Sequence, residues 1–229
     1  MLKKIYEILL QEYGPQGWWP LLDYRGTNPT KTGAVEGYHP AEYDFPKTDQ
    51  QIFEICVGAI LTQNTSWAQV EKALKNLAHE TIITPTGLKK LEENVLKDAI
   101  KPAGYFNQKA KKLLLFIDFY ASLHRRTPSR KELLSVWGIG KETADSILLY
   151  AYGLPIFVVD AYTRRIFSML GFVDKDAEYD VIQNFVMNNL PQDIIVYQEF
   201  HALIVEHAKR HCKTKPDCQK CILKKHCQL

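Results

Sequence analysis

Apolar residues recur at helical spacing along nearly the whole 229-residue chain. One stripe comprises Leu2, Ile5, Ile8 and Leu9, and another runs from Ile52 to Leu61. We find no convincing segment with the alternation of apolar and polar residues that marks a half-buried strand. An apolar content of 46% is sufficient for a core. The pattern predicts an all-α protein of about ten helices.

Capping signals support several of the expected helix starts. Thr48 and Ser66 each stand three residues before a glutamine and just ahead of an apolar stripe, which is the arrangement of a capping box. Asn107 is placed to cap a helix over residues 108–123.

Residues 133–165 contain the pattern that points most directly to function. Gly138 and Gly140 flank Ile139 in a turn between two helical segments, and Asp160 follows an apolar run twenty residues after Gly140. Backbone N–H groups at a helix start can bind a phosphate. A glycine turn is also a common plain connection, and an aspartate there is also a common N-cap. The stretch is therefore a candidate nucleic-acid grip followed by a candidate catalytic acid.

Two elements of this stretch resemble a known family. Leu134–Gly153 resembles the helix–hairpin–helix of the endonuclease III superfamily of DNA glycosylases. Val158-Val159-Asp160 followed by Arg164 resembles the aspartate element of that family. The resemblance extends over nearly all of the chain except roughly residues 22–46.

The resemblance implies two helical lobes with a cleft between them. One lobe is a six-helix block at residues 47–157, and the other combines residues 1–46 with residues 158–229. Asp160 is then expected at the lobe junction, at the mouth of the cleft. Residues 22–46 lack periodicity and predict a long loop, which is either a surface crossover or a segment that reaches over the cleft.

Enzymes of this family act on a nucleotide that is flipped out of double-stranded DNA. The resemblance implies that Gly138, Ile139, Gly140 and Lys141 contact a phosphate. It also implies that Gln63-Asn64 enters the duplex, although an ordinary interhelical turn is an equal alternative. Asp160 is expected to stabilise positive charge on the sugar or to orient the attacking water.

Glu142 distinguishes this chain from the bifunctional relatives. Those enzymes carry a lysine two places after the second glycine, and its amine forms a Schiff base with the sugar. Here Glu142 takes that place and Lys141 comes one residue earlier, which rotates its side chain by about 100° on a helix. Glutamate cannot form an imine, so we predict a monofunctional glycosylase that uses water.

Aromatic residues bear on the choice of base. Trp18-Trp19-Pro20 and Trp67 come from different lobes and could sandwich a flipped base, although each tryptophan could instead be core. Four segments together resemble the 3-methyladenine DNA glycosylase branch, which implies an alkylated purine as substrate: GWWP at 17–20, LTQNTSW at 61–67, KPAGYFNQKAKKL at 101–113 and GIGKETADSILLY at 138–150. Two alternatives stay open: a bifunctional endonuclease III-type enzyme acting on oxidised pyrimidines, and a non-catalytic DNA-binding module.

Four cysteines lie within sixteen residues at the C-terminal end of the chain: Cys212, Cys218, Cys221 and Cys227. Four thiolates in so short a segment can hold one metal centre. The spacing alone fits zinc or iron–sulfur. The resemblance favours a 4Fe–4S cluster, because the endonuclease III cluster loop differs only by one residue in the first interval. Cys56, on an apolar stripe, is expected in the core.

Composition adds only broad limits. The net charge of +3 is compatible with a duplex partner without requiring one. The sequence lacks a run of about 18 apolar residues, so no membrane span is expected. We expect a monomeric cytoplasmic protein associated with the nucleoid.

Overall fold

The computed structural model describes residues 1–29, 36–213 and 215–228, which form helices and loops without a strand. This confirms the predicted all-α class. The α-helices are α1 (Leu2–Tyr13), α2 (Asp49–Leu61), α3 (Trp67–Glu80), α4 (Pro85–Lys89), α5 (Glu93–Ile100), α6 (Phe106–Ser122), α7 (Arg130–Ser135), α8 (Lys141–Ser146), α9 (Ala161–Met169), α10 (Tyr179–Asn189) and α11 (Ile194–Arg210). Short helices of other types are η1 (Lys101–Ala103), η2 (Ile147–Ala151) and η3 (Lys224–His226).

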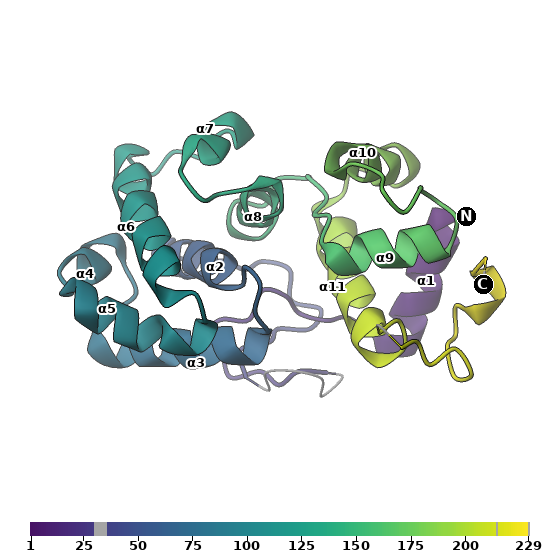
Figure 1. The fold of residues 1–229 in the computed structure, drawn as a ribbon, viewed down its shortest axis with the longest axis horizontal. Coiled ribbons are helices and arrows are strands. Elements are labelled where there is room, and N and C mark those ends of the chain that lie inside the picture. The colour runs from purple at the N-terminus through teal and green to yellow at the C-terminus, as the bar shows by residue number, and fades with distance from the viewer. Residues whose placement is uncertain (30–35, 214, 229) are drawn as a thin grey trace.

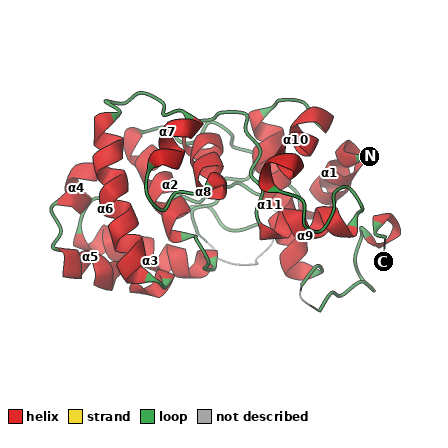
Figure 2. Cartoon of the chain, turned by 45° about the horizontal axis from the view of Figure 1, so that its top comes forward, coloured by secondary structure: helices red, strands yellow, loops and turns green. Residues whose placement is uncertain are grey.

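The helices stand in two groups (Figure 1). Helices α2 to α8 form one group, and α1 lies with α9, α10 and α11 in the other, as a second view also shows (Figure 2). Helix α1 packs against α11, so the two ends of the chain meet in one group. The division at residues 46/47 and 157/158 stays a prediction.

The helix starts only partly follow the predicted caps. The Thr48 hydroxyl accepts a hydrogen bond from the Gln51 amide at 3.2 Å, as expected for a cap of α2. Ser66 precedes α3, but within the described chain its side chain makes no capping bond, so that prediction is wrong. Helix α6 begins at Phe106, one residue before the expected cap Asn107. Tertiary packing of the apolar stripes therefore fixes these two starts without a side-chain cap.

Two buried carboxylates anchor the segment that runs from α1 to α2. Glu199 of α11 accepts a hydrogen bond from the Gln16 amide at 2.8 Å. Glu54 of α2 accepts one from the Leu22 amide, also at 2.8 Å. The crossing segment is thus held from both helical groups, because buried carboxylates need such donors. The predicted loop at 22–46 includes residues 30–35, which lie outside the described residues.

Helix α8 continues without a break into η2, which is a π-helix of five buried residues. A π-helix is rare and is often found near functional sites. Its Tyr150 side chain is only 1% exposed and faces the second helical group.

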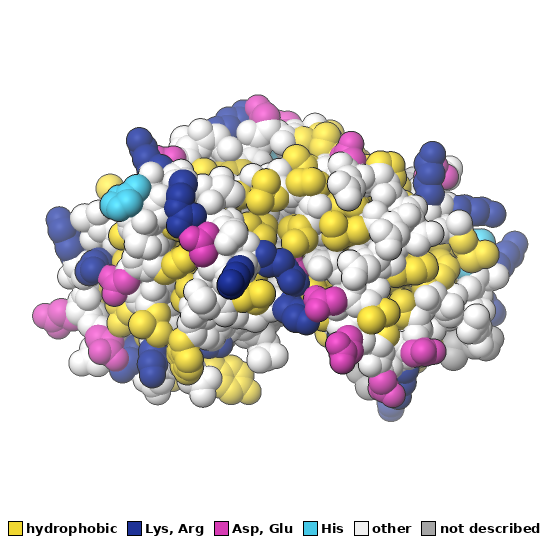
Figure 3. Space-filling view, turned by 90° about the horizontal axis from the view of Figure 1, so that it is seen from above, with side chains coloured by type: hydrophobic (Ala, Val, Ile, Leu, Met, Phe, Trp, Pro, Cys, Tyr) yellow, Lys and Arg dark blue, Asp and Glu magenta, His cyan; other side chains and the backbone are white. Residues whose placement is uncertain are grey.

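The surface between the two groups is hollowed and carries Lys and Arg side chains (Figure 3). No helix among the described residues is long and apolar enough to span a membrane.

Candidate active site

Asp160 is held at the N-terminus of α9, directly after the buried segment that ends at Val159. Its Oδ1 accepts hydrogen bonds from the Thr163 backbone amide at 2.7 Å and from the Thr163 hydroxyl at 2.8 Å. Its Oδ2 lies 3.7 Å from Nε2 of His201, a residue of α11. Its side chain is 13% exposed, so the carboxylate caps α9 while part of it stays accessible to solvent.

The environment of Asp160 keeps its carboxylate ionised. Burial raises the pKa of Asp160, but the neighbouring His201 and the donors of Thr163 outweigh burial and lower the pKa below its usual range. Interactions that favour the charged form of a buried acid act in this direction. Asp160 is therefore negative at neutral pH, as stabilisation of a developing positive charge requires.

Glu142 lies in the first turn of α8 and has the opposite electrostatic behaviour. Desolvation of the carboxyl group by the surrounding protein and then the negative charge of Asp160 raise the pKa of Glu142 to about 7. The nearby His201 lowers this pKa by a smaller amount. The side chain is still exposed to solvent, so its desolvation is only partial. Two neighbouring carboxyl groups with separated pKa values are typical of sites where one acts as an anion and the other can carry a proton.

The glycine hairpin connects α7 to α8. Gly138 has a φ of 85°, a conformation that suits glycine, and a Cβ atom there would meet the Lys112 side chain at 2.6 Å. Ile139 is buried and anchors the turn in the core. Gly140 is the exposed N-cap of α8, with no atom within 4 Å of a Cβ position in the described structure. A phosphate could therefore approach the backbone at Gly140.

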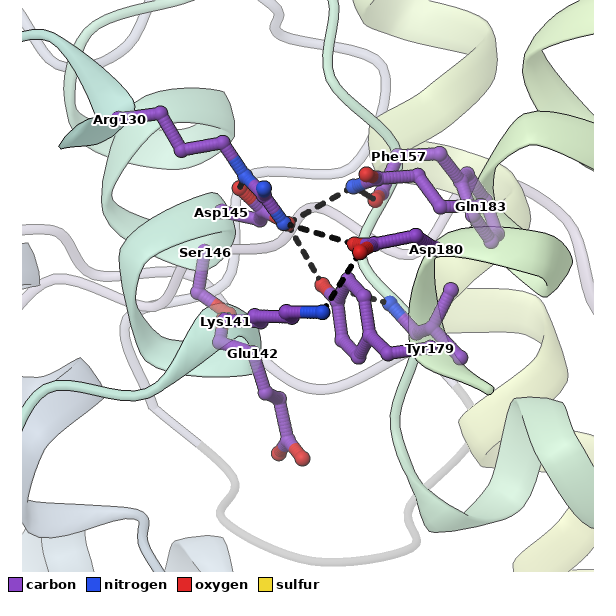
Figure 4. A network of polar contacts seen from close by, with 10 residues as sticks. Arg130, Lys141, Glu142, Asp145, Ser146, Phe157, Tyr179, Asp180 and Gln183 are labelled. Carbon is purple, nitrogen blue, oxygen red and sulfur yellow. Dashed lines mark hydrogen bonds and ion pairs between the residues drawn. The ribbon is translucent and has the colours of Figure 1, made fainter. Parts of the chain in front are cut away.

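The Lys141 side chain points toward α10. Its Nζ lies 2.6 Å from Oδ2 of Asp180 (Figure 4). The predicted rotation of this lysine away from the catalytic carboxylate agrees with this ion pair, whereas its predicted phosphate contact stays untested. Glu142 points away from the Lys141–Asp180 pair, as Figure 4 shows.

A buried polar network supports the hairpin from behind. Asp145 of α8 is fully buried and receives Arg130 Nε at 2.6 Å, the Tyr179 hydroxyl at 2.8 Å and Gln183 Nε2 at 2.7 Å (Figure 4). Tyr179 and Gln183 belong to α10, so the network joins the two helical groups. A buried carboxylate with several donors is well satisfied and fixes the position of the hairpin relative to α10.

The Gln63-Asn64 turn is tied to the same hairpin. Gln63 Nε2 donates to the Gly138 carbonyl at 3.0 Å and to the Thr143 hydroxyl at 2.9 Å, and Lys112 Nζ donates to Gln63 Oε1. Asn64 is exposed, with a φ of 54°. Of the two predicted wedge residues, Gln63 is thus engaged with the protein and Asn64 is free to meet a ligand.

The tryptophans are in direct contact. The rings of Trp19 and Trp67 meet edge-to-face with centroids 5.2 Å apart, and each residue is 5% exposed. Trp18 also contacts Trp67, at 5.3 Å, and stays partly exposed. The expected gap between Trp19 and Trp67 is absent in the described structure, because both rings pack in the core. Trp18 is the tryptophan of this group with an accessible face, and Pro20 is buried beside it.

Comparisons with known proteins agree with this arrangement. The family model described as HhH-GPD superfamily base excision DNA repair protein matches residues 57–192. The chain belongs to the HhH-GPD superfamily. This superfamily assignment makes the protein a base-excision DNA repair glycosylase.

Relatives and solved structures extend the match beyond the family region. A Methanocaldococcus jannaschii protein named as a candidate DNA repair glycosylase is 42% identical over 99% of this chain and 96% of its own length. Endonuclease III of Thermotoga maritima is 31% identical over 81% of this chain and 87% of its own length.

Two solved structures share the fold. A non-covalent endonuclease III–DNA complex has a TM-score of 0.77 at 20% identity, with 99% of this chain and 94% of that chain covered. The H. pylori 3-methyladenine DNA glycosylase bound to 1,N6-ethenoadenine has a TM-score of 0.65 at 28% identity, with 91% and 96% covered. The chain is thus similar over nearly its full length to both branches considered from the sequence.

The four cysteines of this HhH-GPD protein share one cavity. The cavity measures about 350 Å³, and Cys212, Cys218, Cys221 and Cys227 all line it. No three His, Cys, Asp or Glu side chains in the described part of the chain are close enough to form a metal-binding group. Four soft thiol donors around one space with apolar walls nevertheless fit a soft metal centre.

A histidine stands beside this cysteine cavity. His207 Nε2 lies 3.4 Å from Cys221 Sγ, and His207 Nδ1 lies 2.9 Å from the Tyr13 hydroxyl. Tyr13 belongs to α1, so the first helix contributes to the surroundings of the C-terminal cysteines. Such contacts orient ligands at metal centres.

Sequence reasoning missed several residues of the site. His201 lies beside Asp160, and Tyr150 contacts His201. Lys209 of α11 places its Nζ 6.0 Å from the ring centroid of Trp18. Burial lowers the pKa of Lys209, against the opposing charges of Glu206 and Asp160. His201 could have been noticed in the sequence, because it is a histidine within a largely apolar helical segment and such a residue often has a functional partner.

Proposed function

We propose that this DNA glycosylase removes an alkylated purine such as 3-methyladenine from double-stranded DNA by attack of water, without a Schiff base. The observation that carries the proposal is the pair of neighbouring residues on α8. Glu142 lies near enough to Asp160 for the two charges to interact, whereas Lys141 is paired with Asp180. The hairpin thus places the carboxyl group of Glu142, and not the amine of Lys141, near the Asp160 carboxylate.

In this proposal Asp160 stabilises the positive charge that develops on the sugar as the base leaves. Its Oδ1 is fixed by Thr163, so Oδ2 is the oxygen directed to the reaction. Glu142 with its raised pKa can remain protonated near neutral pH and can donate a hydrogen bond to the departing base. A cationic alkylated purine is already a good leaving group and is attracted to the accessible face of Trp18.

The exposed N-cap Gly140 and the exposed Asn64 support a role in holding the duplex. We propose that Gly138, Ile139 and Gly140 present their backbone to a phosphate and that Asn64 occupies the space left by the flipped nucleotide. Similarity to endonuclease III in complex with DNA and to the H. pylori 3-methyladenine enzyme supports this assignment.

We further propose that Cys212, Cys218, Cys221 and Cys227 hold a 4Fe–4S cluster. Their common cavity and the similarity to endonuclease III support iron–sulfur over zinc. The bound cluster would cross-link the C-terminal loop and thereby position its lysines near DNA.

The test is release of free 3-methyladenine from methylated duplex DNA under single-turnover conditions. We expect release by the wild type and a release rate near background for the Asp160→Asn variant. Release of oxidised pyrimidines but not of 3-methyladenine by the wild type would overturn the substrate assignment.

Lys209 gives a specific reason to test a second function. It is an amine with a lowered pKa close to Trp18 and within the electrostatic reach of Asp160. A bifunctional enzyme would use such an amine to form an imine with the sugar. Borohydride trapping distinguishes the two functions. We expect no protein–DNA adduct, whereas an adduct that disappears in Lys209→Ala but persists in Lys141→Ala would assign the lyase reaction to Lys209.

A further inference from the structure

His201 is a buried histidine with one ring nitrogen bound and the other directed at Asp160. It lies in the middle of α11 and is 7% exposed. Its Nδ1 is 2.7 Å from the Tyr150 hydroxyl, and its Nε2 is 3.7 Å from Asp160 Oδ2. Nε2 has no hydrogen-bond partner among the described residues. A buried polar atom of this kind is costly unless it serves a nearby charge.

Tyr150 fixes the orientation of the imidazole. Its hydroxyl lies between His201 Nδ1, at 2.7 Å, and the Gln198 carbonyl of the same helix, at 3.2 Å. Its ring packs on Trp19, with centroids 5.2 Å apart. The Asp160 carboxylate favours a proton on Nε2, since a lone pair there would face a negative oxygen, and the single proton of the phenol is then donated to Nδ1. The proton of a neutral imidazole then resides on Nε2 and faces Asp160.

The two oxygens of Asp160 consequently have different neighbours. Thr163 donates two hydrogen bonds to Oδ1, while the Nε2–H of His201 faces Oδ2 from another helix. We propose that His201, oriented by Tyr150, is a positioning residue that keeps the Asp160 carboxylate ionised and aimed at the sugar of the flipped nucleotide. The inference rests on the proposed catalytic role of Asp160 and adds the partner that role requires.

The decisive experiment measures lesion binding and base excision separately. His201→Phe removes the Nε2–H, and we expect the single-turnover excision rate to fall about 10–100-fold, as for a misplaced catalytic group. The Kd for the methylated duplex should change less than about threefold, because His201 acts through Asp160 rather than on DNA. His201→Gln keeps an N–H donor and should recover part of the rate.

Tyr150→Phe tests the orienting hydroxyl alone, and we expect a loss of about 3–10-fold in rate. Tyr197→Phe is the matched control. Its hydroxyl is buried on α11, the helix of His201, and has no hydrogen-bond partner in the described structure, so its removal should leave the rate unchanged. Equal losses in Tyr150→Phe and Tyr197→Phe would overturn the proposal, because general loosening of α11 would then explain both.

A double variant separates this inference from the proposed function. If His201 acts through Asp160, His201→Phe should cause no further loss in the Asp160→Asn background. Full activity of His201→Phe and Tyr150→Phe beside an inactive Asp160→Asn refutes the inference alone. Full activity of Asp160→Asn refutes the proposed function itself. If His201→Phe does not fold, Tyr150→Phe and His201→Gln still decide the outcome.

Discussion

The Asp160 site and the cysteine cavity are both built against α11, but they are held together in different ways. At Asp160 the protein supplies its own partners from α9 and α11, namely Thr163 and His201. The cysteines share a cavity of about 350 Å³ that is lined by the C-terminal loop together with residues of α9 and α11. The geometry around Asp160 is thus organised by the chain itself, whereas the proposed 4Fe–4S cluster would organise the loop that carries the cysteines.

Helices α9 and α11 connect the two regions, since α9 begins directly after Asp160 and its Met169 lines the cysteine cavity. His201 faces Asp160 and His207 faces Cys221, six positions further along α11. A change in one region should leave the other largely intact as long as α9 and α11 keep their positions. Each of the following variants tests whether the two regions are independent, or tests one interaction within a region.

The largest effect is expected from Asp160→Asn. Loss of the negative charge should lower the single-turnover excision rate by about 10²–10³-fold, which is typical for removal of one preorganised electrostatic group. The visible spectrum of the purified protein should not change, since the cysteine region is independent of Asp160. A change in that spectrum would show that the two regions are coupled.

Cys221→Ser should change the visible spectrum and have a smaller effect on base excision than Asp160→Asn. The broad absorbance near about 400 nm expected of an iron–sulfur protein should disappear, and residues 211–228 should be cleaved faster by protease. Base excision on short duplexes should remain within about tenfold of the wild type, because Asp160 keeps its own partners. Cys56→Ala is the control: Cys56 is buried in the core, away from the cavity, and its loss should leave the spectrum unchanged.

Asp180→Asn tests the DNA-binding side of the catalytic region. Asp180 pairs with Lys141 at 2.6 Å, and both side chains are nearly half exposed. Its neutralisation frees Lys141 for a phosphate, so the Kd for duplex DNA should fall about two- to threefold at low salt. The gain should shrink as salt increases. An unchanged Kd would indicate that Lys141 does not contact DNA.

The smallest effect is expected on the pH dependence of stability in Glu142→Gln. The pKa of Glu142 is raised from 4.5 to about 7 in the folded protein. The folded state therefore binds more protons than the unfolded state between these values, and stability decreases as the pH rises through this window. The variant lacks this loss, so its Tm relative to wild type should rise by about 1–3 °C between about pH 5 and pH 8. A constant Tm difference across this range would contradict the raised pKa.

The local parts of the site were predictable from the sequence, because short segments determine them. The glycine turn at Gly138 and Gly140, and the placement of Asp160 at a helix start, depend on neighbours in the chain. The all-α class was likewise evident from spacing, and the comparisons confirm membership in the endonuclease III superfamily. The different orientations of Glu142 and Lys141 could be predicted, because successive residues on an α-helix are rotated by about 100°.

The contacts between distant segments could not be predicted. The Lys141–Asp180 pair and the approach of His201 to Asp160 depend on how α10 and α11 dock against the hairpin. The tryptophans illustrate the same limit, because their order in the sequence suggested two walls with a gap. In the structure Trp19 and Trp67 are in contact, since packing density rather than residue type decides whether a space remains.

The π-helix η2 has a consequence for comparing this enzyme with its relatives. A π turn holds an extra residue relative to an α turn, so Tyr150 occupies an angular position that its neighbour would take in an uninterrupted α-helix. Deletion of one residue between Ile147 and Leu149 would restore regular α-helical winding and leave the phenol on the side of the helix that faces His201. Alignments in this region should therefore allow a single-residue gap before the tyrosine. Homologues that lack the extra residue can therefore still present a tyrosine to the histidine from a regular α-helix.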